Sequence, residues 1–275
     1  MKFIPLLILV FLLSGCSGLL YYPDQIIYST PKQFKLDYED LYFKSLDGTK
    51  LHAWHLKTKA KKRKGVVLFF HGNAQNLSSH YLSLAWMVNK DYDLLIFDYR
   101  GYGKSEGEPA PESVHLDALS ALDYAHSMIK SNERFIVYAQ SLGGVISLRA
   151  MMDFKKRADI DLAVFDSTFS SYEEIARDRL SSVWLFWPLQ PLAYVLMDDE
   201  YASAKWISKF DRPTLVIHSE DDPVVPYRFG KEIYEKLEAP KDMWSLKEVG
   251  HISTFHGKTY SYRKKFLEYI NKKAH

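Results

Sequence analysis

The chain has 275 residues, of which 47% are hydrophobic and 25% charged, a composition typical of a globular protein with enough apolar material for a sizeable core. Its 36 Lys and Arg residues nearly balance 34 Asp and Glu residues, so the formal charge is only +2 at pH 7. Because the charge is balanced and no basic stripe is interleaved with aromatic residues, we do not expect a nucleic acid as partner.

The N-terminus has the layout of a secretory signal. Met1-Lys2 precedes an almost unbroken apolar run over residues 3–13, which ends in small residues. The run covers about eleven residues, whereas a helix needs roughly twenty to span a bilayer. We therefore expect residues 1–15 to be a signal peptide and not a transmembrane anchor.

Cys16 follows this run and is the only cysteine of the chain. The segment Leu13-Ser14-Gly15-Cys16 resembles the bacterial lipobox, in which the cysteine receives diacylglycerol and becomes the first residue of the mature protein. A chain with one cysteine has no internal disulfide, so the position of Cys16 favours lipidation over a chance thiol. The resemblance implies an exported protein anchored to a membrane by lipid on Cys16. With Ser17 next, it favours the bacterial outer membrane, facing the periplasm.

Residues 16–35 are expected to form an extended tether, and strands and helices alternate after it. This alternation is typical of an α/β protein with a mostly parallel sheet and helices on both faces. An opening hairpin is expected from residues 36–44 and 51–57, turned at Asp47-Gly48. Short apolar runs predict buried strands at 66–70, 94–97, 135–138, 162–165 and 214–217, with a last strand at 243–248. Helices are predicted between them at 79–88, 112–129, 142–152, 229–237 and 260–271.

One connection is too long for a simple crossover. Roughly fifty residues separate the predicted strands 162–165 and 214–217, and a structureless loop of that length is uncommon. We therefore expect a small helical insertion at about residues 168–210. Its aromatic side chains either pack onto the sheet or form a lid and pocket wall over an active site, the candidates being Trp184, Phe186 and Trp187.

The chemistry of the sequence centres on Ser141. This serine follows the predicted strand 135–138 and opens a helix, within the segment Ala-Gln-Ser-Leu-Gly-Gly over residues 139–144. The placement resembles the nucleophile elbow, a strained strand-to-helix turn that exposes a serine and needs small neighbours. Ala139 stands where the usual pattern has its first glycine, and it still meets the requirement for a small residue.

A serine nucleophile needs a base, and the base needs an acid that orients it. Asp222 stands before a Val-Val-Pro segment that follows the strand 214–217, and His251 follows a glycine after the last strand. Both segments resemble those that carry the catalytic acid and base in serine enzymes with a nucleophile elbow. Asp221 is the alternative acid, and His256 is the alternative base.

The fourth element is a turn after the strand 66–70, where His71-Gly72-Asn73 resembles the segment that offers a backbone N–H to a tetrahedral intermediate. By that resemblance the oxyanion donors are the N–H groups of Asn73 and Leu142. His71 is expected to be structural. The glycines of the segment 98–105 are expected to form tight turns near the site.

Together these segments resemble an α/β-hydrolase over residues 36–275, which implies an eight-stranded sheet. The similarity is greatest to lipoprotein hydrolases described as serine-aminopeptidase-like or related to depalmitoylating thioesterases. It implies a serine hydrolase that cleaves small or acyl-chain esters or thioesters through an acyl-enzyme, with no cofactor and no metal. The alternatives are a peptidase that acts on short peptides and a binding lipoprotein whose catalysis has lapsed.

Overall fold

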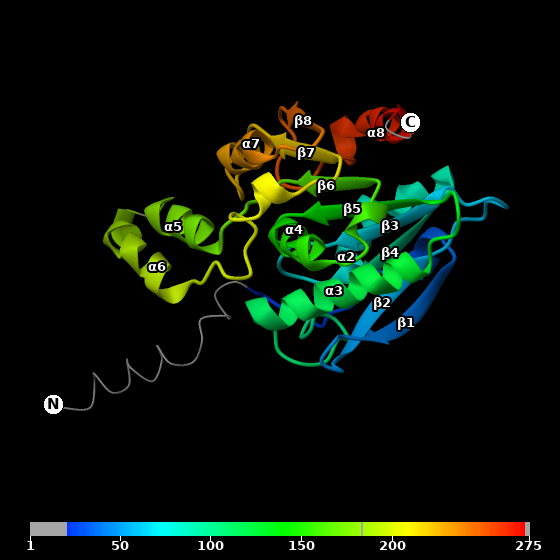
Figure 1. Cartoon of the computed structure of the whole chain (residues 1–275), viewed down its shortest axis with the longest axis horizontal. Helices are drawn as coiled ribbons and strands as arrows, with labels where there is room; N and C mark the ends of the chain where they lie inside the picture. Colours follow the sequence, from blue (N-terminus) through cyan, green and yellow to red (C-terminus); the bar gives the residue numbers. More distant parts are fainter. Residues whose placement is uncertain (1–20, 183, 273–275) are drawn as a thin grey trace.

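The computed structural model describes residues 21–182 and 184–272, so the predicted signal peptide and Cys16 lie outside the described part. The described strands form one eight-stranded sheet in the order β1-β2-β4-β3-β5-β6-β7-β8. β2 runs antiparallel to β1 and β4, and all other neighbours are parallel. The predicted mostly parallel α/β sheet is therefore confirmed (Figure 1). The strands are β1 Tyr38–Lys44, β2 Lys50–Leu56, β3 Gly65–Phe70, β4 Tyr92–Phe97, β5 Arg134–Gln140, β6 Leu162–Asp166, β7 Thr214–Ser219 and β8 Lys241–Leu246.

Helices cover both faces of the sheet. The α-helices are α2 Leu77–His80, α3 Pro111–Ser127, α4 Leu142–Asp153, α5 Tyr172–Ser182, α6 Ala193–Leu196, α7 Tyr227–Lys236 and α8 Tyr262–Lys272. Short 3-10 segments join them at η2 Pro31–Phe34, η3 Tyr81–Ser83, η4 Ala85–Lys90, η5 Arg157–Asp159, η6 Trp184–Leu192, η7 Ile207–Lys209 and η8 Gly257–Thr259. Within the described ranges, no helix has the length and apolar character needed to cross a membrane.

The core lies in two layers, one on each side of the sheet. Successive side chains of a strand point to opposite faces, and β3 is buried throughout. Its residues Val66, Leu68 and Phe70 pack in the layer that contains α3 and α4. Val67 and Phe69 pack in the other layer, with η4 and α8. This two-sided burial explains why the central strands appear in the sequence as continuous apolar runs.

The predicted helix 79–88 is wrong in its type. The chain there forms one turn of α-helix followed by two 3-10 segments. The Trp86 indole N–H donates to the carbonyl of Ser83 at 3.1 Å. Met87 N donates to Leu84 O, three residues back, at 2.9 Å. A side chain has therefore taken the carbonyl that an α-helix would offer to Met87.

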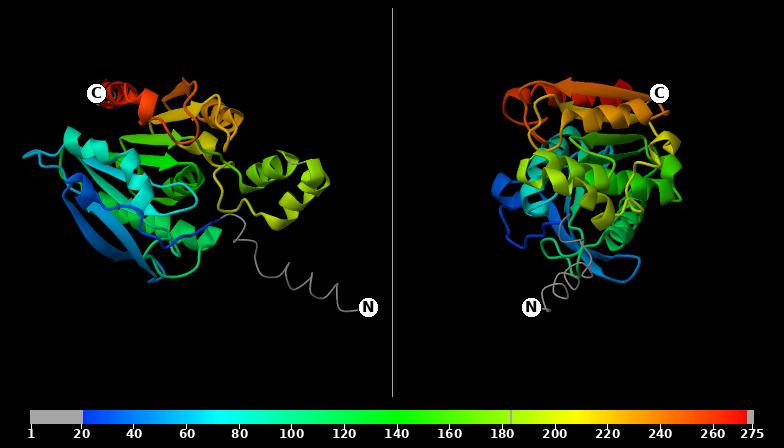
Figure 2. Two further views of the ribbon diagram at one scale, coloured as in Figure 1. Left: turned by 180° about the vertical axis from the view of Figure 1, so that it is seen from behind. Right: turned by 90° about the vertical axis from the view of Figure 1, so that its left-hand side faces the viewer.

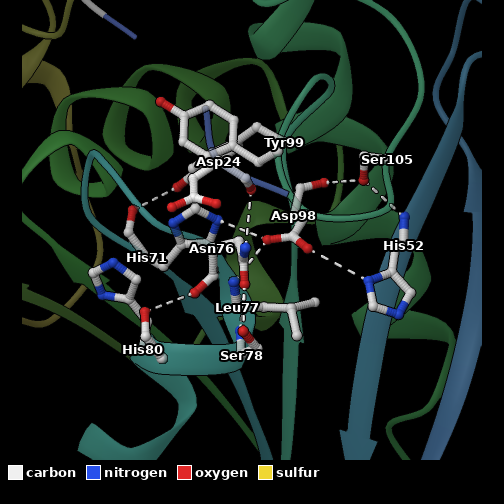
Figure 3. A network of polar contacts seen from close by, with 12 residues as sticks. Asp24, His52, His71, Asn76, Leu77, Ser78, His80, Asp98, Tyr99 and Ser105 are labelled. Carbon is white, nitrogen blue, oxygen red and sulfur yellow. Dashed lines mark hydrogen bonds and ion pairs between the residues drawn. The ribbon is translucent and has the colours of Figure 1, made fainter. Parts of the chain in front are cut away.

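Residues 21–30 form an extended N-terminal strap that is docked on the domain, although we expected a tether here. The side-chain amide of Asn76 donates to the carbonyls of Asp24 and Ile26 at 2.9 and 2.7 Å. Tyr28 N donates to Ser78 Oγ at 3.0 Å. Asn76 and Ser78 lie at the start of α2, directly after the turn that follows β3, and Figure 3 shows this network.

The insertion after β6 consists of α5, η6 and α6, which pack on one another. Figures 1 and 2 show this group projecting from one end of the molecule, away from the sheet. The chain leaves the carboxyl end of β6 to form it and returns to the sheet at β7. It therefore starts at the edge of the sheet where the connections of parallel strands build binding sites.

Candidate active site

Ser141 lies in a strained turn between β5 and α4. Its backbone has φ 51° and ψ −121°, a conformation that a residue with a side chain rarely adopts. Two hydrogen bonds hold it there: Ser141 N donates to Asp166 O at 3.0 Å, and Thr168 Oγ1 donates to Ser141 O at 2.6 Å. Strain of this kind costs of order 1–3 kcal/mol and is typical of functional sites. The backbone is therefore that of the predicted elbow.

The glycines after Ser141 are required by close packing. A Cβ on Gly143 would lie 2.4 Å from the carbonyl oxygen of Phe70, and one on Gly144 would lie 2.0 Å from Thr168 Oγ1. Real Cβ atoms do not approach other atoms so closely, so only glycine fits at either position without movement of the backbone. The first turn of α4 is thereby held against the end of β3.

His251 and Asp222 are brought together from two different loops at the end of the sheet. His251 Nδ1 lies 2.8 Å from Asp222 Oδ2. The other carboxylate oxygen of Asp222 accepts hydrogen bonds from the N–H groups of Val224 and Val225 at 2.8 and 2.9 Å. A proton on Nδ1 in this arrangement leaves Nε2 unprotonated, and Nε2 is the nitrogen that can act as a base.

The surroundings of Asp222 keep its carboxylate ionised. Burial alone would raise its pKa, but the hydrogen bond and charge of His251 and the N–H groups of Val225 and Val224 outweigh burial and lower the pKa below its ordinary value. The side chain of Asp222 is fully buried, so its contact with His251 is shielded from solvent. A buried carboxylate of this kind can orient an imidazole and stabilise its protonated form.

The alternative residues occupy other positions. Asp221 accepts a hydrogen bond from Glu248 N at 2.8 Å. His256 is exposed, and its backbone N–H donates to Ser253 O at 3.2 Å. The geometry thus pairs His251 with Asp222 and favours these two over Asp221 and His256.

Asp166, which the sequence analysis did not single out, links the elbow to the loop that carries His251. The side-chain amide of Gln140, which precedes Ser141, donates to Asp166 Oδ2 at 3.0 Å. Thr254 Oγ1, three residues after His251, donates to Asp166 Oδ1 at 3.1 Å. Gln140 and Thr254 are therefore both held by the buried carboxylate of Asp166, at the end of β6.

The turn after β3 lies against Ser141. A Cβ on Gly72 would lie 3.4 Å from the Cβ of Ser141. Asn73 and Leu142, whose N–H groups are the predicted oxyanion donors, line the same cavity as Ser141. The side-chain oxygen of Asn73 accepts hydrogen bonds from Tyr22 N at 2.9 Å and Tyr102 Oη at 2.7 Å. The strap and the segment after β4 thus both fix this turn.

Asp98 is the centre of a second buried network, behind the turn (Figure 3). It accepts a hydrogen bond from Leu77 N at 2.7 Å and lies 3.4 Å from both His71 Nε2 and His52 Nδ1. Burial opposes its ionisation, but its bonds with the two histidines keep its pKa below the ordinary value. Gly103, one of the glycines in the segment 98–105, packs against this carboxylate. A Cβ at this position would lie 1.9 Å from Asp98 Oδ2, so a larger residue would not fit.

His80 closes the same turn from the other side. Its Nε2 lies 3.2 Å from the carbonyl oxygen of Ala74, and its ring stacks on His71 with centroids 5.2 Å apart. Burial, with a smaller effect from neighbouring His71, lowers the pKa of His80 to about 3. The ring is therefore neutral around pH 7 and acts as a hydrogen-bonding and packing group.

A cavity of about 640 Å³ opens above Ser141. Its floor is formed by Ser141, Asn73 and Leu142, and its walls are mainly apolar. The walls come from the strap, from the loop after β7 and above all from the insertion, through side chains that include Tyr22, Val225, Ile175, Leu180, Leu189 and Leu192. The volume is within the range of sites that bind small molecules.

The structure corrects one detail of the predicted lid. Trp184 and Trp187 are 85% and 63% exposed, and among the described residues the η6 side chains that line the cavity are Leu189 and Leu192. η6 is a 3-10 helix, in which residues three apart share a face, so the two tryptophans lie on one face and the two leucines on another. Phe186, the third predicted residue, has a side chain outside the described part.

Within residues 21–182 and 184–272, no group of three or more His, Cys, Asp or Glu side chains is arranged to hold a metal ion. The cavity floor instead has the hydroxyl of Ser141 and backbone N–H groups, and the imidazole of His251 with its carboxylate partner lies at the same end of the sheet. This set is suited to nucleophilic attack on a carbonyl group and to stabilising the resulting oxyanion.

Known proteins are similar to this chain in sequence and in fold. Residues 61–205 match the family model described as serine aminopeptidase, S33. The uncharacterized protein YfhR of Salmonella typhi is 33% identical over 265 residues, covering 91% of this chain and 86% of that protein. Lysophosphatidylserine lipase ABHD12 of Xenopus tropicalis is 29% identical over 215 residues, covering 74% of this chain and 53% of that protein.

Among solved structures, the Pyrococcus furiosus esterase Pf2001 superposes with a TM-score of 0.74 at 20% identity, covering 92% of this chain and 98% of that one. The esterase EaEST from Exiguobacterium antarcticum superposes with a TM-score of 0.64 at 17% identity, covering 85% of this chain and 100% of that one. The fold is thus the one these enzymes share. The chain belongs to the serine aminopeptidase S33 family and is a hydrolase with the α/β-hydrolase fold.

Proposed function

We propose that this protein is a serine esterase that cleaves carboxylic esters or thioesters of apolar acyl groups through a covalent acyl-enzyme. The observation that carries the proposal is the hydrogen-bonded pair of His251 and Asp222 at the end of the sheet that also holds the strained Ser141. The apolar cavity above Ser141 supports the choice of acyl substrate. Lysophosphatidylserine lipase ABHD12, a relative, and the esterase Pf2001, a structural neighbour, carry names consistent with it.

The mechanism has two stages. Nε2 of His251 takes the proton of Ser141 Oγ as that oxygen attacks the carbonyl carbon, and Asp222 stabilises the imidazolium. The N–H groups of Asn73 and Leu142 donate to the oxyanion, and each such donor is worth roughly 3 kcal/mol in the transition state. The imidazolium then protonates the leaving alcohol or thiol. Water, deprotonated by His251, finally attacks the acyl-enzyme and releases the acid.

The test is a chain-length series of p-nitrophenyl esters, from acetyl to hexanoyl. Each buried methylene contributes about 0.8 kcal/mol, roughly fourfold in an equilibrium constant, so kcat/KM should rise by more than about tenfold along the series. The rise should be smaller in Leu192→Ala, which removes part of the cavity wall, than in the wild type. Trp187→Ala is the matched control, because Trp187 is on the exposed face of the same helix. A maximum at acetyl in the wild type would contradict an acyl-chain cavity.

We also propose that the protein is exported and anchored by lipid on Cys16, in the outer membrane and facing the periplasm. The support is the position of the only cysteine, after a short apolar run that ends in small residues. Cys16→Ala should abolish incorporation of radiolabelled palmitate in cells and move the protein out of the membrane fraction. A variant that stays in the membrane fraction would contradict anchoring by this cysteine.

A further inference from the structure

The insertion presents an apolar face to solvent. Trp184 and Trp187, which share one side of η6, and Leu185 on the adjacent side are each more than half exposed, and we call the three together the η6 apolar face. Three large apolar side chains in four consecutive residues are a larger exposed cluster than single surface hydrophobics normally make. η6 belongs to the insertion, which projects from one end of the molecule (Figure 2).

The strap enters the domain at the base of the same insertion. Tyr21, the first described residue, is buried, and its Oη lies 3.4 Å from the Oη of Tyr172. Tyr172 is the first residue of α5, the helix that leads to η6. Tyr22, the next residue of the strap, lines the cavity. The N-terminal end of the described chain is therefore fixed between the cavity and the foot of α5.

Chain length then limits where a lipid on Cys16 can be. Cys16 precedes Tyr21 by five residues, and five residues span at most about 18 Å. A bilayer that holds Cys16 must lie within that reach of the base of α5. α5 has 11 residues and rises about 16 Å from Tyr172 to its far end, where η6 begins. From the base of α5, the start of η6 is therefore about as far away as the lipid on Cys16 can reach.

We propose that the η6 apolar face lies in the interfacial layer of the membrane to which Cys16 is anchored, so that the insertion is a lipid-docking element. The inference depends on the lipid anchor proposed above. Tryptophan favours the headgroup region because its ring combines an apolar body with a polar N–H group, and apolar side chains beside it add burial. Another side of η6, through Leu189 and Leu192, lines the cavity. Acyl esters that reside in the membrane are therefore the substrate class that this arrangement serves.

The tryptophans of the chain make the test specific. Of six tryptophans, Trp54, Trp86 and Trp244 are buried, and Trp206 is half-buried. Trp206 lies outside the insertion, and the guanidinium of Arg149 and the ammonium of Lys209 both contact its ring. Trp184 and Trp187 are the two that the proposal places in lipid. Quenching by lipid can thus be assigned by substitution with phenylalanine, which keeps an aromatic side chain.

The full-length lipidated protein is reconstituted in vesicles of phosphatidylethanolamine and phosphatidylglycerol, with acyl chains brominated or not. Brominated lipid should quench the tryptophan emission of the wild type, and the combined Trp184→Phe and Trp187→Phe variant should lose more than half of that quenching. Trp206→Phe is the matched control and should keep it. Equal quenching in the wild type and the double variant would overturn the proposal.

An unquenched wild type would also overturn it, whether or not crosslinking then shows that the η6 apolar face contacts a second copy or another protein. Palmitate incorporation and turnover of soluble esters are measured on the same samples. If the protein carries no lipid, the proposed anchor and the docking inference are both overturned. A lipidated and active protein with unquenched tryptophans overturns the docking inference alone, and the esterase proposal stands.

Discussion

The end of the sheet that holds the candidate active site and the insertion above it are built in opposite ways. At the end of the sheet, buried hydrogen bonds to Asp166 hold the segments that carry Ser141 and His251, and a buried hydrogen bond to Asp98 holds the start of α2, after the turn that follows β3. The insertion contacts the site mainly through apolar side chains, and part of its apolar surface is exposed. Buried polar networks fix geometry, whereas apolar contacts tolerate many arrangements. The difference suits the proposed catalytic residues, which need a fixed geometry, and a cavity wall that can vary.

The largest expected effect is on catalysis, at the end of the sheet. Asp222→Asn keeps the shape of the side chain but removes the charge that orients His251, and kcat should fall about 10⁴-fold. Steady-state kinetics with a p-nitrophenyl ester measures this fall. Asp221→Asn is the matched control, because Asp221 accepts a hydrogen bond from Glu248 N and lies one residue away. A fall of similar size in the control would reassign the acid.

A large effect on stability is expected from the ion pairs that Arg100 makes after β4. Arg100 donates from Nη2 to Asp117 at 2.7 Å and from Nη1 to Asp47 at 2.8 Å, and the side chain of Asp117 is fully buried. Arg100→Ala removes the cation paired with the buried carboxylate of Asp117 and leaves it the backbone N–H of residue 100, which should cost about 3–5 kcal/mol of unfolding free energy. Urea unfolding measures it. A loss below about 1 kcal/mol would show that these ion pairs contribute less to the unfolding free energy than their burial suggests.

A smaller effect links stability to pH. The pKa of His80 is lowered to about 3 in the folded protein from an ordinary value of 6.5. Below pH 6.5 the unfolded chain binds a proton that the folded chain does not, so this histidine lowers stability as the pH falls from 6.5 toward 3. Between pH 7 and pH 5 its share is about 2 kcal/mol.

Urea unfolding of the wild type and of His80→Gln at both pH values isolates this share, because other histidines contribute equally to the two proteins. The loss of unfolding free energy between pH 7 and pH 5 should be smaller in His80→Gln by about 2 kcal/mol. An equal loss in both proteins would contradict the burial of a neutral His80.

The smallest effect is expected on the insertion. Trp184 is mostly exposed and does not line the cavity in the described part of the structure, so Trp184→Ala should change the unfolding free energy by less than about 0.5 kcal/mol. Turnover of soluble acetyl esters should stay within about twofold of the wild type. Thermal unfolding and the same ester assay measure both. A clear loss of stability would mean that the insertion is built as tightly as the sheet.

The same difference explains what the sequence could predict. The buried strands appear as apolar runs, and Ser141, Asp222 and His251 stand at their ends in recognisable segments, so the sheet and these residues could be predicted. Asp166 follows an ordinary strand and carries no local signal of its links to Gln140 and Thr254. Its role depends on contacts between segments far apart in the chain, which no local pattern encodes.

The insertion and the strap were harder to predict for a related reason. The inward and outward faces of η6 follow a three-residue period, and a sequence rich in apolar residues on all sides does not reveal that period. The docking of Tyr22 depends on long-range hydrogen bonds from its backbone N–H to Asn73 Oδ1 and to Tyr102 Oη. Backbone hydrogen bonds leave no trace in residue type, so the strap resembled a tether in the sequence.

The central claim is that Ser141 is the nucleophile, and covalent labelling tests it most directly. A fluorophosphonate should add one adduct to the wild type, and peptide mass spectrometry should place it on Ser141. Ser141→Ala should take up no label while its thermal unfolding remains cooperative. An adduct on another residue, or a folded wild type that takes up no label, would contradict the account.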